Sequence, residues 1–466
     1  MQIFRELVAQ NNALRFLFDT MEINSSMGRE HLLNSNFETC QVQLEEEFCR
    51  IESVISRLQV KETDSLFSKI KHELYLLHNI KTTIERIRQG SVLDDIELFE
   101  VKKTAMSMQQ IVQNLVALQL PLFSFADLSP VVSILDPDAT GLPHFFIYPS
   151  YDDRLPRLRA ALAAAKCEDE RLQIQLEATK VEDEVRIRLS EQLSPYADAL
   201  QQNLSYAAHV DLLIAKAELA LRWHCCRPIF SRDELIYEGL ENPLVKNRLV
   251  NTGRNFQALD IVLHQQPVLI TGSNMSGKTI FLKSIELAQL MCQFGFFVPA
   301  KSATISLVDE VITSIGDHQS ELSGLSSYCV EILAVNHIIK EAKAGKKLLL
   351  LVDELARTTN PAEGKALVAA FVKLLTQYDV FTLITTHYDI HEVDCRRLRV
   401  KGLDVSRVRE KLTPYNINLY MDYALVETEE VNVPTEALNI AKIFKVDEEF
   451  LQVASSFYKE TSDSVS

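Results

Sequence analysis

Apolar residues recur at helical spacing through the first half of the chain. Between residues 40 and 58 they fall on one face of a helix, with acidic residues on the opposite face. Glycine is scarce from residue 1 to about residue 225, so little in this stretch interrupts a helix. The pattern predicts an all-α region, whose clearest apolar stripe comprises Val42, Leu44, Phe48, Ile51, Val54 and Ile55.

A proline-rich segment interrupts this pattern between residues 130 and 156. The last apolar piece within it, residues 145–149, predicts a short strand. From Arg157 to Trp223 the apolar spacing predicts two long helices, separated near Pro195 because proline cannot continue a helix interior. The first of these helices has a balanced mix of charges, which favours a solvated or coiled-coil face over a nucleic-acid surface.

Beyond residue 230 the helical spacing gives way to apolar runs that alternate with helical stretches. Three runs, at residues 266–270, 346–354 and 380–387, are almost continuously apolar. Runs of this length are typical of central parallel strands, which are buried on both faces. We therefore predict an α/β domain, and the expected division is a helical core (1–129), a proline-rich connector (130–156), long lever-like helices (157–226) and an α/β domain (227–466).

Composition narrows the class of protein. The apolar fraction of 47% and the charged fraction of 24% are those of an ordinary globular chain. No run of eighteen apolar residues exists, and the start contains Glu6 and Asp19, so we expect no membrane span, no signal peptide and a cytoplasmic location. The net charge of −16 disfavours a protein that depends on gripping nucleic acid, although it does not exclude a local basic patch.

The stretch TGSNMSGKT, residues 271–279, has the spacing of a phosphate-binding loop. It follows an apolar run and opens a helical one, so backbone N–H groups and the helix N-terminus face the same anion. We expect Lys278 to reach the β- and γ-phosphates of ATP and Thr279 to ligate Mg²⁺. The predicted ATP-binding residues are Gly272, Ser273, Asn274, Met275, Ser276, Gly277, Lys278 and Thr279.

Two further apolar runs end in residues that complete an ATPase site. The run LLLLVDE ends in Asp353, expected to hold Mg²⁺, and Glu354, expected to polarise the attacking water. The run LITTHYD leads to His387, which is expected to sense or contact the γ-phosphate. Together with Lys278 these residues predict ATP hydrolysis. Adjacent acids after one strand and a histidine after the next favour the ABC type of P-loop ATPase over a kinase.

Domains of the ABC type commonly work as dimers in which a signature segment of one subunit completes the site of the other. The candidate segment is SGLSSYCVEI, residues 323–332. We expect Ser326 and Ser327 to face the γ-phosphate bound by the partner chain. A homodimer follows as the expected assembly.

Five stretches between residues 271 and 388 resemble motifs of the MutS family, in the same order. TGSNMSGKTI is similar to TGPNMGGKST, and the end of AQLMCQFGFFVPA matches FVPA. IGDHQSELSGLSSYCVEI is similar to the segment around STFxxE, DELARTTNPAEG stands in the place of DEIGRGTSTxDG, and TTHY in that of ATHY. The resemblance implies a MutS-type ATPase domain preceded by an all-α helical core and lever helices.

The chain also departs from the family pattern. The resemblance implies a short form, since the chain begins at about the helical core and we expect neither the mismatch-recognition domain nor the connector domain. Ala356 and Thr358 replace family glycines, so the loop after Glu354 is expected to communicate differently with the partner site. The residues assigned to ATP hydrolysis are all retained.

Two functions from different classes remain open. The favoured hypothesis is that ATP-driven movement of the helical arms remodels a protein partner. The loop DELARTTNP and the short architecture resemble the ATPase component of factors that reactivate cobalamin-dependent aminomutases such as lysine 5,6-aminomutase. The alternative is a repair or recombination ATPase that binds mismatched or branched DNA.

Overall fold

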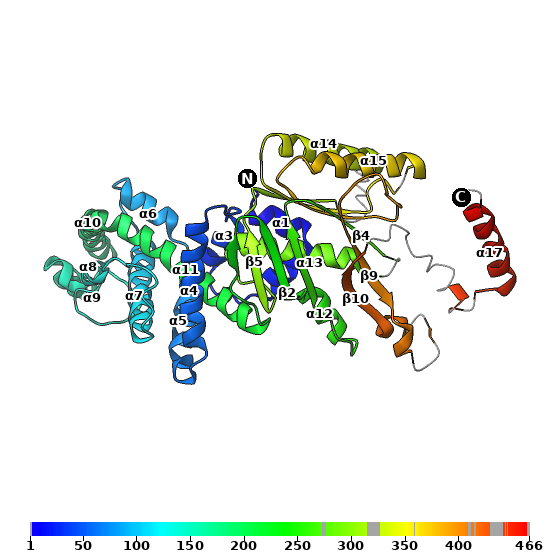
Figure 1. Cartoon of the computed structure of the whole chain (residues 1–466). Helices are drawn as coiled ribbons and strands as arrows, with labels where there is room; N and C mark the ends of the chain where they lie inside the picture. The colour runs from blue at the N-terminus through cyan, green and yellow to red at the C-terminus, as the bar shows by residue number, and fades with distance from the viewer. Residues whose placement is uncertain are drawn as a thin grey trace. The chain divides into compact units, whose positions relative to one another are not determined.

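A computed structural model of the chain describes residues 2–272, 276–314, 327–357, 359–408, 412–413, 416–428, 441–442, 444 and 446–463. The chain divides into two compact units (Figure 1). We call Met21–Ser35 and Cys49–Glu218 the helical unit, and Met1–Thr20, Asn36–Phe48 and Leu219–Ser466 the α/β unit. Among the described residues, every helix is too short or too polar to cross a bilayer.

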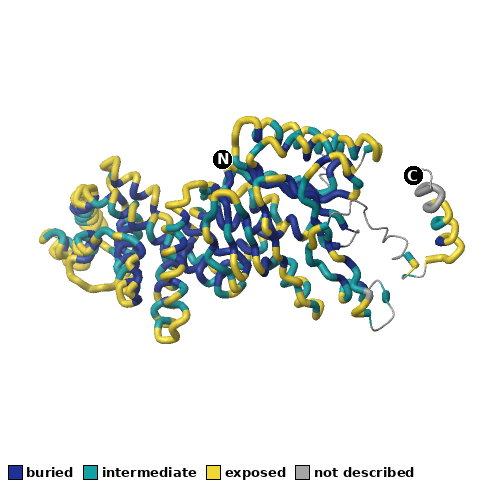
Figure 2. Tube along the Cα trace, viewed as in Figure 1, coloured by how far each residue is buried: buried dark blue, intermediate teal, exposed yellow. Residues whose placement is uncertain are grey.

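The helical unit confirms the predicted all-α character of the first half of the chain. Buried residues, dark blue in Figure 2, recur along its helices between exposed ones, and most of them are apolar. Its helices lie, wholly or in part, at α3 (Ser26–Leu33), α4 (Gln41–Leu58), η1 (Lys61–Thr63), α5 (Asp64–Leu76), α6 (Lys81–Arg88), α7 (Asp95–Ala117), α8 (Ser129–Leu135), η2 (Pro149–Tyr151), α9 (Arg154–Ala164), α10 (Glu168–Leu193), η3 (Ser194–Tyr196) and α11 (Ala197–Arg222).

Two long helices were predicted after residue 156, but the described residues there form three α-helices. The chain forms α9, α10 and α11, and the extra interruption lies between Ala164 and Glu168. Cys167 takes an extended backbone there, and its Sγ accepts a hydrogen bond from the N–H of Glu170 at 3.4 Å. This N-terminal cap starts a new helix, with an acidic first turn that suits the helix dipole.

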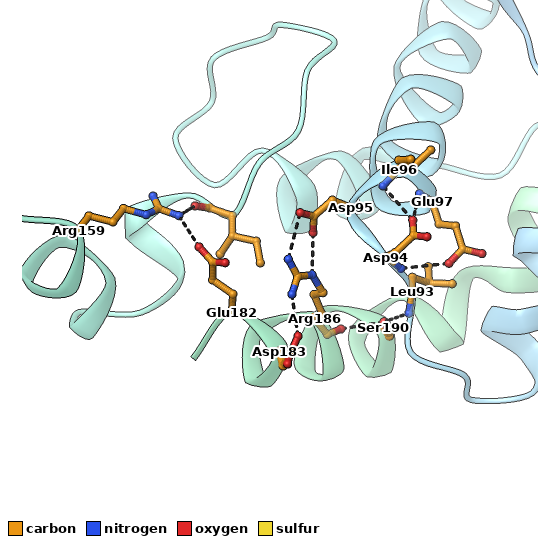
Figure 3. Close-up of polar contacts among 11 residues, drawn as sticks. Leu93, Asp94, Asp95, Ile96, Glu97, Arg159, Glu182, Asp183, Arg186 and Ser190 are labelled. Atoms are coloured by element: carbon orange, nitrogen blue, oxygen red, sulfur yellow. Dashed lines mark hydrogen bonds and ion pairs between the residues drawn. The ribbon is translucent and has the colours of Figure 1, made fainter. Parts of the chain in front are cut away.

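Polar contacts fasten α10 to the start of α7 (Figure 3). Arg186 binds both carboxylate oxygens of Asp95, at 2.8 and 3.1 Å. One helical turn further along α10, the Ser190 hydroxyl accepts a hydrogen bond from the N–H of Leu93 at 2.9 Å. A capping box formed by Asp94 and Glu97 begins α7 beside these contacts. The charged face of α10 thus holds a neighbouring helix as well as meeting solvent.

A buried lysine organises the proline-rich segment. Lys102 of α7 is fully buried, and its Nζ donates hydrogen bonds to Asp136 Oδ1 at 3.0 Å, to the carbonyl of His144 at 2.9 Å and to the hydroxyl of Tyr148 at 3.0 Å. The short strand predicted for residues 145–149 is absent from this described stretch. Ile147 and Tyr148 bury their side chains without a neighbouring strand, so an apolar run alone misled the prediction.

The described residues of the α/β unit form two sheets. In the six-stranded sheet, of order β10-β9-β4-β8-β7-β6, only β10 runs antiparallel to its neighbour. The four-stranded sheet has the order β1-β5-β2-β3. The strands are β1 (Ile229–Ser231), β2 (Glu234–Leu240), β3 (Leu259–His264), β4 (Pro267–Thr271), β5 (Ser302–Ser306), β6 (Glu310–Ser314), β7 (Leu348–Asp353), β8 (Phe381–Thr385), β9 (Arg396–Leu403) and β10 (Met421–Glu427).

The three almost continuous apolar runs form β4, β7 and β8, which confirms the predicted central parallel strands. They pair side by side in the order β4-β8-β7. The helices of this unit are α1 (Phe4–Gln10), α2 (Asn12–Thr20), α12 (Pro243–Val250), α13 (Lys278–Gln293), α14 (Ser327–Lys343), α15 (Pro361–Leu375), η4 (Val405–Arg407), η5 (Ile417–Tyr420) and α17 (Glu448–Asp463). A helical first half and a mixed α/β second half are therefore established.

Helix α13 is anchored at its far end by two buried glutamines. Gln293 donates to the carbonyls of Glu38 and Val308, both at 2.8 Å, and accepts from the N–H of Val308 at 3.1 Å. Gln289 donates to Gln293 at 2.6 Å and to the carbonyl of Ser306 at 3.0 Å. Since buried polar groups are costly unless paired, these bonds fix the register of α13 within the unit. Its opposite end, at Lys278, is thereby positioned too.

Candidate nucleotide site

The predicted site residues meet at one edge of the six-stranded sheet. Strands β4, β7 and β8 run parallel, so their carboxyl ends lie together, with Ile270 opposite Thr385 and Thr385 opposite Asp353. The predicted phosphate loop follows β4, Glu354 follows β7, and His387 follows β8. Crevices at this edge of parallel sheets are where such folds bind ligands. Residues more than 70 positions apart are thus brought to one place.

The described part of the phosphate loop has the backbone that its glycines permit. Gly277 has φ +82° and Gly272 has φ +152°, both in a region that side chains disfavour. A Cβ on Gly277 would lie 3.0 Å from the ring of Tyr423, and one on Gly272 would lie 3.1 Å from Ser276 Oγ. Both glycines are therefore required for space as well as for conformation. The predicted contacts of Ser273, Asn274 and Met275 lie outside the described residues.

Lys278 opens α13 and is held inside the loop. Its side chain is buried, and Nζ donates to the carbonyl of Gly272 at 2.6 Å. This bond holds the ammonium group beside the first turn of α13, and the N-terminus of a helix favours bound anions. A buried ammonium group at a helix N-terminus makes a strong anion site.

Asp353 joins two hydroxyl groups at the sheet edge. Thr279 Oγ1 donates to Asp353 Oδ2 at 2.6 Å, and Thr385 Oγ1 donates to Asp353 Oδ1 at 2.5 Å. Thr279 and Asp353 were predicted as site residues from the sequence, whereas Thr385 was not. The sequence could have indicated Thr385, because this hydroxyl residue is the last of a buried strand and stands two positions before His387.

Glu354 is paired with the histidine assigned to the γ-phosphate. Its Oε1 is hydrogen-bonded to His387 Nε2, and its Oε2 lies 3.3 Å from Arg357 Nη1. The bond from His387 is the largest effect on the pKa of Glu354, and it outweighs partial burial to lower that pKa to about 2. The carboxylate is therefore ionised across the physiological pH range.

A tyrosine from the sheet edge packs against the outside of the loop. The pairing of β10 with β9 is irregular between Asp422 and Leu425, and Tyr423 lies in this bulge. Gln257 accepts a hydrogen bond from the Tyr423 N–H at 3.0 Å and donates to Asp422 at 2.8 Å. Bulges commonly re-aim a side chain beside a functional site, and this one directs the Tyr423 ring at Gly277. Sequence reasoning did not find this residue.

The structure describes only part of the segment 323–332, which was predicted to complete the site of a partner subunit. Ser326 lies outside the described residues, and Ser327 is described as the first residue of α14 without its side chain. The described residues also hold no cluster of three or more His, Cys, Asp or Glu that could form an all-protein metal site.

The residues at the sheet edge fit a Mg²⁺–nucleotide. Asp353 and Thr279 provide the carboxylate and hydroxyl oxygens that Mg²⁺ prefers, already within 2.6 Å of each other. When bound, Mg²⁺ would supply a Lewis acid that neutralises charge on the phosphate oxygens.

Residues 268–462 match the family model of MutS domain V. This part of the chain is therefore similar to MutS domain V. The sheet edge formed by β4, β7 and β8 lies at the start and centre of this domain. The motif resemblance noted in the sequence is therefore confirmed for the C-terminal half of the chain.

Characterised relatives match the same part. The DNA mismatch repair protein MutS of Thermus aquaticus is 35% identical over 223 residues, which cover 47% of this chain and 26% of that protein. MutS of Streptococcus sanguinis is 32% identical over 232 residues, 49% of this chain and 27% of its own length. Endonuclease MutS2 of Lacticaseibacillus casei is 35% identical over 202 residues, which cover 43% of this chain and 25% of that protein. The chain thus spans about a quarter of the length of these curated relatives, and the similarity is that of domain V.

Proposed function

We propose that this protein is a P-loop ATPase of the MutS type that acts on DNA. The observation that carries the ATPase activity is the joining of Lys278, Thr279 and Asp353 at the sheet edge, with Glu354 and His387 beside them. The location of these residues in a MutS domain V supports it.

In this proposal each residue has a defined task. Lys278 binds the β- and γ-phosphate oxygens of ATP, while Thr279 and Asp353 hold Mg²⁺. Glu354 orients a water molecule for attack on the γ-phosphorus, the bond to the β–γ bridging oxygen breaks, and ADP and phosphate leave. Because the pKa of Glu354 is about 2, its carboxylate is a weak base. We therefore assign it to orienting the water, and the released phosphate takes up the proton.

DNA is the substrate class that the relatives favour. Their names refer to DNA mismatch repair and to an endonuclease, and none of these names supports a role in reactivating an aminomutase. We therefore prefer the DNA alternative over the protein-partner hypothesis that the loop DELARTTNP suggested. The net charge of −16 means that a DNA-binding face would have to be locally basic.

We further propose that the chain works as a homodimer, with Ser326 and Ser327 of one subunit completing the site of the other. ATP binding would then draw two sites together and move the helical arms, a rigid-body switch. Sedimentation of the purified chain with and without ATP tests this proposal. A monomer under both conditions, at concentrations where ATP is hydrolysed, would exclude it.

Two variants test the ATPase assignment. Lys278→Ala is expected to abolish nucleotide binding, measured by equilibrium binding of a fluorescent ATP analogue. Glu354→Gln is expected to retain binding while slowing hydrolysis at least a hundredfold, so that ATP stays bound. An unchanged turnover rate in Glu354→Gln would remove that residue from the reaction.

Binding to homoduplex, mismatched and four-way-junction DNA across a salt series tests the substrate class. We expect tight binding to one of these structures, with an affinity that falls steeply as salt rises because phosphate contacts release counterions. If the protein hydrolyses ATP but binds none of the three DNAs at low salt, DNA is rejected as the substrate class. The protein-partner hypothesis is then favoured. A cobalamin-dependent aminomutase would then be the first partner to test.

A further inference from the structure

The peptide of Ala356 is held from both sides by side chains from two different elements. Its N–H donates to Glu331 Oε2, on α14, at 3.1 Å. Its carbonyl accepts a hydrogen bond from the hydroxyl of Tyr388, which follows β8, at 2.7 Å. Ala356 itself is fully buried, so water cannot replace these two bonds, and its carbonyl also accepts a longer hydrogen bond from the N–H of Thr359 at 3.4 Å.

The turn that contains Ala356 has a backbone that needs such support. Glu354 has φ +53° and Ala356 has φ +61°, and both are residues with a Cβ in the left-handed region. Strained backbone of this kind persists only where surrounding contacts hold it, and it gathers at functional sites. The family pattern has glycine where this chain has Ala356, and alanine, unlike glycine, is strained at a positive φ.

The surroundings of the turn are closely packed. A Cβ on Gly364 would meet the hydroxyl end of Tyr388 and lie 3.1 Å from the carbonyl oxygen of Ala356, so only glycine fits there. Burial, and then the nearby charge of Glu331, raise the pKa of Tyr388, which keeps its hydroxyl protonated as a donor. The two clamping side chains are therefore close neighbours.

We infer that Glu331 and Tyr388 are positioning residues for Glu354, because together they clamp the Ala356 peptide and keep the turn 354–357 in its left-handed form. This inference rests on the proposed ATPase function and adds to it. The direction of the Glu354 side chain depends on its own φ, which the turn fixes, while its N–H is held by the carbonyl and hydroxyl of Thr385 at 3.1 and 3.0 Å.

The clamp also gives α14 control over the water-orienting carboxylate. Glu331 lies in the first turns of α14, four residues after Ser327, which we assign to the trans contact. A shift of α14 on dimer closure would move the Glu331 carboxylate, and through the Ala356 N–H it would change the turn that carries Glu354. The trans contact would thereby regulate hydrolysis through one hydrogen bond.

The test compares Glu331→Ala, Glu331→Gln and Tyr388→Phe in the full-length chain. Glu331→Ala is expected to lower kcat about tenfold to a hundredfold, with the affinity for a fluorescent ATP analogue changed by less than about twofold. Glu331→Gln retains an acceptor oxygen and should stay close to wild type. Glu341→Ala is the matched control, because Glu341 lies on the same helix and pairs with Lys346 and His337 at the surface.

A second readout does not depend on ATP. Arg357 ends the turn with an exposed side chain, so trypsin cleavage after it, mapped by mass spectrometry, reports release of the turn. Glu331→Ala and Tyr388→Phe should accelerate this cleavage, and the control should not. In Glu331→Ala, the added change Ala356→Gly should recover part of kcat, since glycine holds the left-handed backbone without a clamp.

The outcomes separate the two proposals. If wild type neither binds nor hydrolyses ATP, the proposed function fails, while the cleavage pattern still decides whether the clamp exists. If wild type hydrolyses ATP and Glu331→Ala matches it in both kcat and cleavage, the inference is overturned. It is also overturned if kcat, nucleotide affinity and melting temperature all fall together, because Glu331 would then only stabilise the fold.

Discussion

The hydroxyl of Thr279, on the first turn of α13, donates a 2.6 Å hydrogen bond to the carboxylate of Asp353 at the end of β7. This bond joins the two motifs from which the Mg²⁺ site was predicted, although 74 positions separate them in sequence. The two oxygens lie close enough to share a metal or a metal-bound water. This geometry is the reason that we propose the pair as ligands of Mg²⁺.

Replacing Thr279 should make nucleotide binding insensitive to magnesium. Thr279→Ala removes the hydroxyl and leaves Asp353 with Thr385 as its remaining hydroxyl donor from this edge. In wild type, ATP should bind more tightly in Mg²⁺ than in EDTA. We expect this ratio of affinities to be about tenfold smaller in Thr279→Ala and unchanged in Thr279→Ser. Isothermal titration with and without Mg²⁺ measures the difference. An equal Mg²⁺ dependence in wild type and Thr279→Ala would remove Thr279 from the metal site.

Gly277→Ala should weaken nucleotide binding far more than a glycine replacement of similar backbone cost. Gly277 and Gly253 have φ +82° and +70°, so alanine pays about 1 kcal/mol at either position. Only at Gly277 does the new Cβ also meet a ring, 3.0 Å away at Tyr423, whereas Gly253 has open space. We expect ATP affinity to fall at least tenfold in Gly277→Ala and to stay near wild type in Gly253→Ala. Adding Tyr423→Ala to Gly277→Ala should recover part of the loss.

Ser276→Ala should stabilise the nucleotide-free protein. Ser276 is 2% exposed, and within the described residues its hydroxyl has no hydrogen-bond partner. Removing a buried, unpaired hydroxyl is expected to raise the free energy of unfolding by about 1 kcal/mol. Ser284→Ala is the control, since the Ser284 hydroxyl is equally buried but donates to the carbonyl of Ile280 at 2.7 Å. Urea unfolding should show opposite signs for the two variants, and a loss of stability in both would contradict the prediction.

Lys102→Met should destabilise the helical unit by about 3–5 kcal/mol, because it leaves the buried Asp136 carboxylate without its charge partner. Lys103→Met, at the next and less buried position, is the control and should cost under about 1 kcal/mol. Chemical unfolding at pH 7 measures both.

The same pair predicts a dependence on acid. Burial alone would raise the pKa of Asp136, but hydrogen bonds from Thr140, Gly141 and Lys102 lower it to about 2. A depressed pKa means that the stabilisation is present above the unfolded value near 4 and is lost as the pH falls from about 4 to 2. Unfolding measured in steps from pH 6 to pH 2 should show this loss in wild type. In Lys102→Met the folded-state pKa of Asp136 should lie closer to its unfolded value, so the stability lost over this pH range should be smaller than in wild type.

The sequence predicted those features that a local pattern specifies. The apolar runs of β4, β7 and β8 are each five or six residues long and buried on both faces, so length and composition alone identified them. Because parallel strands end at one edge, the polar residues that follow them were expected together, and Lys278, Thr279, Asp353, Glu354 and His387 do lie there.

Features that depend on long-range pairing could not be read in the same way. Strand β1 has three residues and pairs with β5 about 75 positions later, so no local periodicity marks the four-stranded sheet. Phe4 packs against Phe294 and Phe296 of the α/β unit, although the helical pattern around it placed residues 1–129 in the predicted helical core. Tyr423 contacts Gly277 because β10 has a bulge there, and no residue type in β10 predicts that bulge from the sequence.

The three hydrogen bonds of Lys102 also divide the proline-rich segment into a fixed part and a tolerant part. Asp136, His144 and Tyr148 are tied to α7, while Leu142 and Pro143 between them are exposed. A short peptide tag or a fluorescent label inserted between Leu142 and Pro143 would extend into solvent and leave the lysine contacts intact. The helical unit therefore offers an attachment point for a label that would report whether this unit moves when ATP binds.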